Sequence, residues 1–245
     1  MKAIVTGSSR GLGAAIVARL LARKIEVLGL ARQQPPTLPP ATAARYTHAT
    51  LDLADTGALE DWLAGSAMAR FVAGAERALL INNAGTLQPV GPLGGQDAAA
   101  IARAIRLNVS APLALADAFV AATAQVRDRR IVHISSGAAR SAYAGWSVYG
   151  ASKAALDHHA RGVHEDAVPG LRICALAPGV VDTDMQAEVR GSDAAHFPMR
   201  ARFEALKRDG MLTSPAACAA QLVDYLLSAE FARTPVADLR ALSGH

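Results

Sequence analysis

The sequence predicts an α/β fold, a doubly wound parallel sheet that carries helices on both faces. Along the 245 residues, short apolar or β-branched runs alternate with alanine-rich stretches of helical character. Strands that alternate with helices in this way are typical of right-handed crossovers between parallel strands. The chain is 51% hydrophobic and 19% charged, which provides apolar side chains for one large core and excludes a disordered chain.

The expected elements begin with a strand at residues 3–6, a helix at residues 12–23 and a second strand at residues 26–30. The strands are short buried runs, whereas the helix has apolar residues at helical spacing. Later apolar runs predict strands at residues 79–81, 131–134 and 172–176. The proline-rich segment 35–40 predicts a loop, because proline lacks the N–H that a helix or a central strand needs. No repeat or domain-sized change in composition interrupts this pattern, so residues 1–245 are predicted to form a single domain.

A glycine-rich segment connects the first expected strand to the first expected helix, with the sequence Thr6-Gly7-Ser8-Ser9-Arg10-Gly11-Leu12-Gly13. A phosphate can lie against free backbone N–H groups at a helix N-terminus only where no Cβ stands in the way. The spacing Gly-x3-Gly-x-Gly differs from the better-known dinucleotide fingerprint, and a tight glycine turn would show it too. Its position at the first strand–helix junction favours dinucleotide binding, and with it a Rossmann-type fold.

Two arginines near the expected ribose site indicate which dinucleotide binds. Sites specific for NAD usually place an acidic residue about twenty residues after the glycine motif. This chain has Arg32 there, and Arg10 lies inside the glycine loop. Two guanidinium groups suit the 2′-phosphate of NADP(H), which a carboxylate would repel. The alternative is that both arginines are simply solvated. We therefore predict NADP(H) as the cofactor.

A serine, a tyrosine and a lysine follow the strand expected at residues 131–134. Ser136 lies just beyond that strand, and Tyr149 and Lys153 are spaced i and i+4, so they share one face of a helix. An ammonium group near a phenol favours the phenolate, so we expect the pKa of Tyr149 to fall below its usual value of about 10. Tyr149 would then act as a general acid or base near neutral pH, with Ser136 holding the substrate oxygen. A surface pair would show the same spacing, so the prediction depends on the serine and the nucleotide loop before it.

The order and spacing of these motifs resemble the short-chain dehydrogenase/reductase family over nearly the whole chain. The motifs that carry the resemblance are Thr6-Gly7-x3-Gly11-x-Gly13, Asn82-Asn83-Ala84-Gly85, Asn108, Ser136, Tyr149-x3-Lys153 and Pro178-Gly179. The resemblance implies that Tyr149 is the general acid and base and that Ser136 orients the carbonyl group. It also implies that Lys153 binds the nicotinamide ribose and lowers the pKa of Tyr149, and that Asn108 supports a water relay to Lys153.

The same resemblance implies the cofactor contacts. Residues 83–85 would line the adenosine side, Asp52 would face the adenine, and Thr183 would contact the nicotinamide amide. With the glycine loop and the two arginines, the expected NADP(H)-binding residues are Gly7, Ser9, Arg10, Gly11, Leu12, Gly13, Arg32, Asp52, Leu53, Asn83, Ala84, Gly85, Tyr149, Lys153, Pro178, Gly179, Val181 and Thr183.

The second half of the chain resembles more closely the sepiapterin reductases and their bacterial benzil-reductase-like relatives, in residues 144–149, 177–186 and 230–238. This similarity implies an NADPH-dependent carbonyl reductase that acts on vicinal dicarbonyl compounds, sepiapterin-like or benzil-like. Residues 185–212 are predicted to form a substrate lid and residues 230–245 a substrate-side tail. The expected substrate contacts are Ser136, Trp146, Tyr149, Met185 and Asp238.

Asp238 is the lone carboxylate in the otherwise apolar run at residues 235–239, at the position of the aspartate that anchors the pterin in sepiapterin reductase. A buried carboxylate needs hydrogen-bond donors. A pterin ring or another N–H-bearing ligand would supply them. The alternative is a surface or capping aspartate.

Two other functions stay open at this point. The same chemistry would serve a 3-oxoacyl thioester or another ketone or alcohol, because a fold alone does not select a substrate. A non-catalytic NADP(H)-sensing protein would use the same fold. Sensors of that kind typically lose the tyrosine or the lysine, and this chain keeps both.

Charge and composition narrow the expected partners. The net charge of +4 is scattered and aromatic residues make up only 4%, so we expect a small-molecule carbonyl substrate and no nucleic acid. No membrane span or signal peptide is evident, and two cysteines form no disulfide framework, which predicts a cytoplasmic protein. His158, His159 and His164 lack metal-ligand spacing, so no metal is expected. The tail lacks the glycine-rich last strand that often closes a tetramer in this family, which favours a homodimer through the Tyr149 helix and the helix before it.

Overall fold

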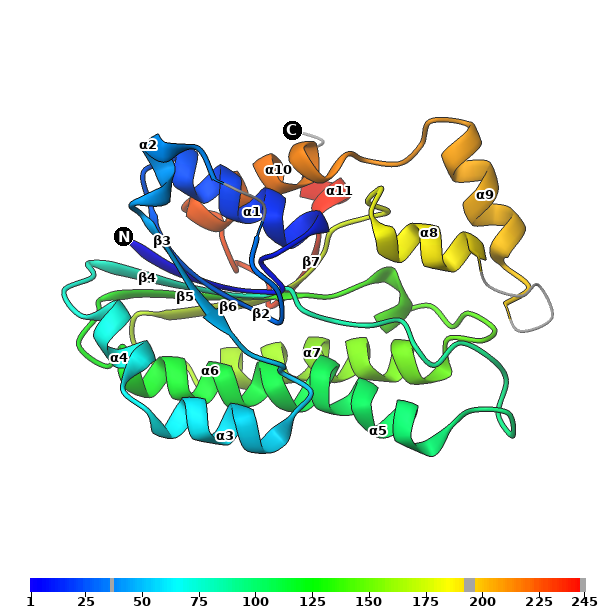
Figure 1. Cartoon of the computed structure of the whole chain (residues 1–245), viewed down its shortest axis with the longest axis horizontal. Coiled ribbons are helices and arrows are strands. Elements are labelled where there is room, and N and C mark those ends of the chain that lie inside the picture. The colour runs from blue at the N-terminus through cyan, green and yellow to red at the C-terminus, as the bar shows by residue number, and fades with distance from the viewer. Residues whose placement is uncertain (36–37, 192–196, 243–245) are drawn as a thin grey trace.

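The computed structural model describes residues 1–35, 38–191 and 197–242. In these residues seven strands form one sheet in the order β3-β2-β1-β4-β5-β6-β7, and all neighbouring strands are parallel (Figure 1). The predicted doubly wound parallel sheet is therefore confirmed. The strands are β1 (Lys2–Thr6), β2 (Glu26–Ala31), β3 (Tyr46–Thr50), β4 (Arg77–Asn82), β5 (Asp128–Ile134), β6 (Leu171–Ala177) and β7 (Val236–Asp238).

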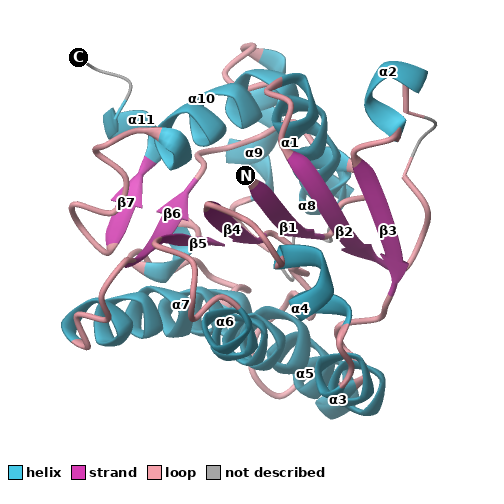
Figure 2. Ribbon diagram, turned by 90° about the vertical axis from the view of Figure 1, so that its left-hand side faces the viewer, coloured by secondary structure: helices cyan, strands magenta, loops and turns pink. Residues whose placement is uncertain are grey.

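Helices cover both faces of the sheet (Figure 2). One face carries α1 (Gly11–Ala22) and α10 (Pro215–Leu227), which pack against each other. The opposite face carries α3 (Thr56–Ala64), α4 (Ala67–Val72), α5 (Ala98–Ile105), α6 (Ala111–Ala122) and α7 (Ser147–Glu165). Shorter helices complete the described chain, namely α2 (Pro40–Ala43), α8 (Asp184–Gly191), α9 (Arg200–Arg208) and α11 (Leu239–Leu242).

The central strands are buried on both faces, which explains their uninterrupted apolar sequences. In β1, Ala3 and Val5 belong to the core beneath α1 and α10, whereas Ile4 belongs to the core beneath α6. In β4, Leu79 and Leu80 divide between the same two cores. Successive side chains of a strand point to opposite faces, so a strand covered on both faces needs an apolar residue at every position.

The sequence analysis missed the two edge strands, β3 and β7. β3 is half-exposed and β7 has only three residues, so neither shows the apolar run that marks a buried strand. The loop predicted at residues 35–40 is wrong at Pro40, where α2 begins. The first residue of a helix makes no use of its N–H, so proline fits there. Residues 36–37 of that segment lie outside the described residues.

One helical run, Ala98–Ala122, is long and apolar enough to cross a membrane by length and composition alone. It comprises α5, α6 and the π-helical turn between them. Within the run, Ala111, Leu115 and Phe119 are buried in the core beneath the sheet. A helix that packs in a protein core needs apolar residues as well, so it passes the same test of length and composition.

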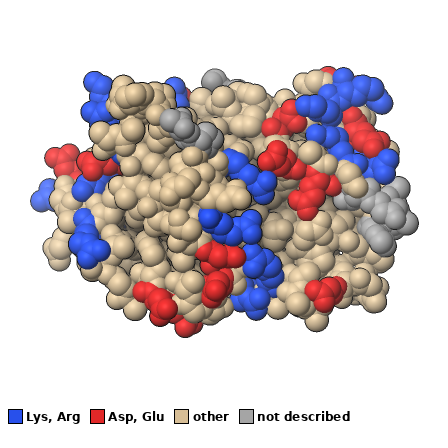
Figure 3. All heavy atoms as spheres, in the orientation of Figure 1, with Lys and Arg blue, Asp and Glu red and all other residues tan. Residues whose placement is uncertain are grey.

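The segment predicted as a lid, residues 185–212, contains α8 and α9 at one end of the molecule. Phe203 on α9 is buried, whereas Arg202 and Arg208 on the same helix are exposed. Figure 3 shows basic and acidic side chains interspersed over this end of the molecule. Helix α9 thus packs against the rest of the protein through the face that carries Phe203. Residues 192–196 lie outside the described residues, and movement of a lid stays a prediction.

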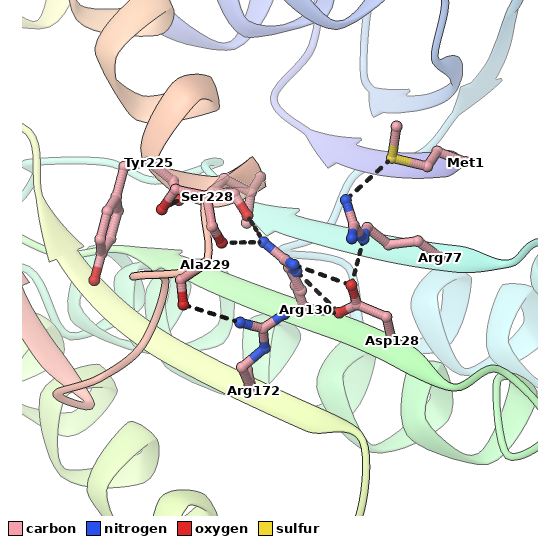
Figure 4. A network of polar contacts seen from close by, with 9 residues as sticks. Met1, Arg77, Asp128, Arg130, Arg172, Tyr225, Ser228 and Ala229 are labelled. Carbon is pink, nitrogen blue, oxygen red and sulfur yellow. Dashed lines mark hydrogen bonds and ion pairs between the residues drawn. The ribbon is translucent and has the colours of Figure 1, made fainter.

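An ion network joins the amino ends of β4, β5 and β6 (Figure 4). The guanidinium of Arg130 donates to both oxygens of the Asp128 carboxylate at 2.9 and 3.0 Å, Arg172 donates at 3.2 Å, and Arg77 donates to the same carboxylate. Partial burial alone would raise the pKa of Asp128, but the three guanidinium groups hold it well below its usual range. Arg130 also donates to two carbonyl oxygens at the C-terminal end of α10, which fastens that helix to the sheet.

Candidate active site

A cavity of about 480 Å³ opens at the carboxyl ends of the parallel strands, which is the edge where open α/β sheets bind ligands. Ser136, Trp146 and Met185 lie in its wall, whereas Asn108 and Asp238 do not. Every residue predicted to bind NADP(H) lines it, namely Gly7, Ser9, Arg10, Gly11, Leu12, Gly13, Arg32, Asp52, Leu53, Asn83, Ala84, Gly85, Tyr149, Lys153, Pro178, Gly179, Val181 and Thr183.

The loop between β1 and α1 can exist only with glycine at key positions. Gly7 and Gly11 have φ of +65° and +54°, in the left-handed region that favours glycine. A Cβ at Gly13 would lie 2.0 Å from the carbonyl oxygen of Gly7 and 2.6 Å from Nδ2 of Asn83. The loop therefore forms a cradle without side chains at the N-terminus of α1, and such a cradle fits the pyrophosphate of a dinucleotide.

Thr6 fastens this cradle to the loop after β4. Its hydroxyl oxygen accepts hydrogen bonds from the backbone N–H groups of Asn83 and Ala84, each at 2.9 Å. In return, the side-chain amide of Asn83 donates to the carbonyl oxygen of Thr6 at 3.0 Å. Two segments far apart in the sequence thus share one wall of the cavity, which explains why both carry recognisable motifs.

The two arginines predicted to contact a 2′-phosphate have different surroundings. Arg10 donates to the carboxylate of Asp184 at 3.1 Å, and both side chains are largely exposed. Arg32 lies near Asp52, which accepts a hydrogen bond from Arg103 at 2.9 Å. Partial burial alone would raise the pKa of Asp52, but a backbone N–H, Arg103 and the charge of Arg32 lower it. This end of the cavity therefore presents the cations Arg10 and Arg32 to a ligand.

Tyr149 and Lys153 project from α7 toward the end of β5, where Ser136 follows the strand. Their side chains are almost fully buried, at 8% and 5% exposed. The Lys153 ammonium donates to the carbonyl oxygen of Ile134 at 2.8 Å, and its nitrogen lies 5.7 Å from the centre of the Tyr149 ring. The three predicted catalytic side chains that line the cavity thus lie together.

The prediction that Lys153 lowers the pKa of Tyr149 is wrong for this structure. Burial raises the pKa of the Tyr149 phenol above its ordinary value, and a hydrogen bond with Ser136 offsets only part of that rise. Burial also lowers the pKa of Lys153 to about 8, against the opposing charge of Asp157. Tyr149 is therefore a neutral phenol at neutral pH, the form that can give up a proton.

Asn108 lies directly behind the cavity wall, in the π-helical turn Arg106–Ser110. Its side-chain oxygen accepts from the N–H of Thr86 at 2.9 Å, and its amide donates to the hydroxyl of Ser152 at 3.1 Å. A Cβ at Gly85 would lie 3.3 Å from that oxygen and 3.5 Å from the nitrogen of Lys153. Glycine at this position therefore leaves the space between Asn108 and Lys153 free of side chains.

A cluster of aromatic side chains centres on Trp146, whose ring packs against that of Tyr149. Trp146 stacks on Phe197 with ring centres 4.8 Å apart, and its ring centre lies 5.4 Å from those of Tyr149 and Phe203. Tyr143 adds a further ring at 5.5 Å from Trp146. This cluster gives the cavity an apolar, flat-sided wall next to the phenol.

The sequence analysis missed part of this wall. The missed residues come from loops and short helices, and their position near Tyr149 depends on tertiary packing that no local motif records. The clearest available signal was that several lie within the predicted lid or tail. Cavity-lining residues of this kind are Leu87, Tyr143, Gln186, Arg202, Phe203, Leu206 and Arg240.

The Asp238 carboxylate has hydrogen-bond donors within the protein, which favours the second of its two alternatives, a surface or capping aspartate. Arg240 supplies them, through its backbone N–H at 3.0 Å, its Nε at 2.9 Å and its Nη2 at 2.6 Å. Arg140 lies 3.9 Å away. The hydrogen bonds from Arg240 lower the pKa of Asp238, against its partial burial. Contact between Asp238 and a substrate stays a prediction, and residues 243–245 of the tail lie outside the described residues.

Of the three histidines in α7, His159 forms a pair with His133 of β5. Nε2 of buried His133 lies 3.1 Å from Nδ1 of His159, and burial lowers the pKa of His133 to about 3. The pair is therefore neutral and hydrogen-bonded, and His158 and His164 are not part of it. Among the residues that the structure describes, no group of three His, Cys, Asp or Glu side chains could hold a metal ion.

Comparison with known proteins identifies the family. The model of the short chain dehydrogenase family matches residues 1–194. A benzil reductase ((S)-benzoin forming) from Bacillus cereus is 33% identical, covering 93% of this chain and 94% of its own length. A sepiapterin reductase from Meriones unguiculatus is 31% identical, covering 91% of this chain and 90% of its own.

A solved structure gives the same result. A short-chain dehydrogenase/reductase from Burkholderia vietnamiensis is 47% identical, covers 98% of this chain and 97% of its own, and superposes with a TM-score of 0.72. The predicted resemblance to the benzil and sepiapterin reductases is confirmed by the relatives found. The chain therefore belongs to the short-chain dehydrogenase/reductase family, and it is an oxidoreductase that acts on carbonyl or hydroxyl groups.

Proposed function

We propose that this protein is an NADPH-dependent reductase of vicinal dicarbonyl compounds, with Tyr149 as its general acid. The observation that carries the proposal is the continuity of the cavity. One space has Arg10, Arg32 and the glycine loop in its wall and also Tyr149 beside Ser136. An enzyme that positions an extended dinucleotide against a carbonyl group needs both in one space.

When bound, NADPH would supply the hydride to the carbonyl carbon. The side chains supply the rest of the chemistry. Tyr149 gives its phenolic proton to the carbonyl oxygen as negative charge develops there, and the hydroxyl of Ser136 holds that oxygen. The raised pKa of Tyr149 keeps the phenol protonated at neutral pH. Lys153 holds the nicotinamide ribose, and its ammonium stays fixed beside the phenol by donating to the carbonyl oxygen of Ile134.

Asn108 serves in this proposal as a positioning residue. It does not line the cavity, but its side-chain amide holds the backbone of Thr86 and the hydroxyl of Ser152, and Gly85 leaves room between Asn108 and Lys153. A water molecule in that space would connect Lys153 to Asn108, as the family resemblance implies. Proton return to Lys153 and Tyr149 after each turnover would follow this route.

Two observations support a flat dicarbonyl substrate. The wall next to Tyr149 is built from the rings of Trp146, Tyr143 and Phe203, which suit planar conjugated groups. The relatives that match most of this chain include benzil reductases and sepiapterin reductases.

Three further predictions from the sequence also stay proposals. They are the homodimer, the cytoplasmic location and the single domain over residues 1–245.

The substrate proposal is tested by following NADPH oxidation with purified protein. The panel contains benzil, its monoketone analogue 1,2-diphenylethanone, sepiapterin and a 3-oxoacyl thioester. We expect the highest kcat/KM with a vicinal dicarbonyl, because its second carbonyl group is on the carbon next to the one that is reduced and so lies close to the catalytic residues. A higher value with the thioester would contradict the substrate class. NADPH binding without turnover of any carbonyl would instead indicate a sensing protein.

The cofactor proposal makes a separate prediction for Arg10 and Arg32. Two charge-assisted hydrogen bonds to a 2′-phosphate contribute roughly 1.5–3 kcal/mol each, so we expect kcat/KM to favour NADPH over NADH by at least about tenfold. The double replacement Arg10→Ala with Arg32→Ala should abolish that preference and leave kcat/KM for NADH nearly unchanged. Arg23→Ala is the control, because Arg23 lies at the end of α1 and pairs with Asp224. Equal kcat/KM for NADPH and NADH in the unmodified protein would show that neither arginine binds the 2′-phosphate.

A further inference from the structure

Arg240 is a cavity-lining cation that lies outside every recognised motif. It follows β7 in the short helix α11, and its side chain lies against Gly179, where a Cβ would be only 3.2 Å from its Cδ. Gly179 has φ of +81°, so the turn after β6 both requires glycine and leaves room for the arginine. The side chain therefore extends along the wall that the Pro178-Gly179 motif gives to the cavity.

Asp238 fixes the direction of this guanidinium group. Its carboxylate accepts from Nε and Nη2 of Arg240, a two-point contact that holds the guanidinium plane. Both nitrogens on that side of the group are thereby occupied. Among the described residues, no acceptor pairs with the remaining nitrogen, Nη1. The Arg240 side chain is 66% exposed and that of Asp238 only 19%, so the guanidinium is far more accessible than the carboxylate that holds it.

The charge around Arg240 is balanced. Asp238 offsets its positive charge, and behind this pair Arg140 lies 3.9 Å from both Asp238 and Asp157. The four side chains comprise two cations and two anions. Tyr143 is the other polar side chain near Arg240, and it too lines the cavity. A donor whose charge is already paired with a carboxylate suits an uncharged oxygen acceptor better than it suits a free anion.

We propose that Arg240 is a specificity-determining residue that donates a hydrogen bond from Nη1 to the second carbonyl oxygen of a vicinal dicarbonyl substrate. Asp238 is then a positioning residue that aims Arg240, and not itself a ligand of the substrate. The inference rests on the proposed function. Only one of the two carbonyl groups is reduced, next to Tyr149, so the other remains a ketone throughout and keeps its bond to Arg240 in the hydroxyketone product.

The test compares two substrates that differ only in the second carbonyl group, benzil and 1,2-diphenylethanone. Arg240→Met keeps the stem that packs on Gly179 but removes the donor. We expect kcat/KM for benzil to fall by roughly tenfold or more, as for loss of a charge-assisted hydrogen bond. The value for 1,2-diphenylethanone should change by less than about twofold, and KM for NADPH should stay the same. The ratio of the two kcat/KM values is therefore the readout.

Three further variants test the role of Asp238, the need for a donor at position 240 and the specificity of the effect. Asp238→Asn should lower the same ratio by a smaller factor, because the guanidinium remains but is no longer held by two charged contacts. Arg240→Lys, which keeps a donor, should recover part of the loss and serves if Arg240→Met fails to fold. Arg233→Met is the control, because Arg233 lies on the same tail, pairs with Glu230 at 2.7 Å and is absent from the cavity wall. It should leave the ratio unchanged.

The outcomes separate this inference from the proposal beneath it. Equal losses for both substrates in Arg240→Met, or a raised KM for NADPH, would overturn the role of Arg240 while leaving the reductase intact. If the unmodified protein reduces 1,2-diphenylethanone as well as it reduces benzil, the second carbonyl group is not recognised, and the inference fails. If it reduces neither, the proposed substrate class itself is wrong.

Discussion

Replacing Tyr149 by phenylalanine is expected to lower kcat by about 10²–10⁴-fold, the usual contribution of a positioned general acid. The phenol is buried beside Ser136 and its raised pKa keeps it protonated at neutral pH, so the replacement removes the proton donor of the proposed mechanism. The ring itself, which packs on Trp146, is retained. Kcat from NADPH oxidation and the dissociation constant for NADPH from fluorescence titration are the measurements.

Tyr143→Phe is the matched control for this experiment. It removes a phenolic hydroxyl from the same cavity wall, and Tyr143 also packs against Trp146. We expect it to cost far less than Tyr149→Phe. NADPH should bind both variants about as tightly as it binds the unmodified protein. Turnover near the unmodified level in Tyr149→Phe would exclude the proposed mechanism.

Replacing Asp128 by alanine is expected to lower the free energy of unfolding by about 3 kcal/mol, the lower end of the cost of breaking a buried ion pair. Its carboxylate is the shared acceptor of Arg77, Arg130 and Arg172. The Arg130 side chain is only 3% exposed, so removal of the carboxylate leaves a buried, uncompensated charge. Urea unfolding followed by circular dichroism measures the change.

Asp224→Ala is the control, because Asp224 also accepts from two arginines, Arg19 and Arg23, but its side chain is 48% exposed. Exposed pairs contribute about 0–1 kcal/mol. The pKa of Asp128 is lower in the folded protein than in the unfolded chain, so its contribution is fully present above pH about 4 and is lost as the pH falls below that value. Asp128→Ala should therefore show a weaker loss of stability on acidification. If Asp128→Ala and Asp224→Ala lower the free energy of unfolding at neutral pH by the same amount, the burial of Arg130 does not add to the cost of losing its carboxylate partner.

The fold and the cofactor loop could be predicted from the sequence because their signals are local. A strand buried on both faces is apolar at every position, and the loop after β1 needs glycine where a Cβ at Gly13 would meet the carbonyl oxygen of Gly7. Tyr149 and Lys153 were likewise found from spacing along one helix. Each of these signals lies within a few residues of chain.

The features that could not be predicted depend on burial and on side-chain direction. The pKa of Tyr149 is raised because its environment is desolvated, and no spacing of Tyr and Lys reports desolvation. Asp238 appeared to lack donors because the sequence does not show that the Arg240 side chain turns back onto it. The aromatic wall around Trp146 draws its rings from separate segments. Side-chain contacts of this kind exist only once the tertiary structure has formed.

The central position of β1 in the sheet constrains how the chain matures on the ribosome. On one side Lys2 lies opposite Glu26, which is made soon afterwards, but on the other side it lies opposite Ala78. Until β4 has emerged, β1 keeps one edge open, and open edges between apolar strands invite aggregation. The glycine loop also reaches its final shape only when Asn83 has docked on Thr6. A nascent chain that stops short of β4 therefore keeps this apolar edge of β1 unpaired and lacks the contact that holds the glycine loop.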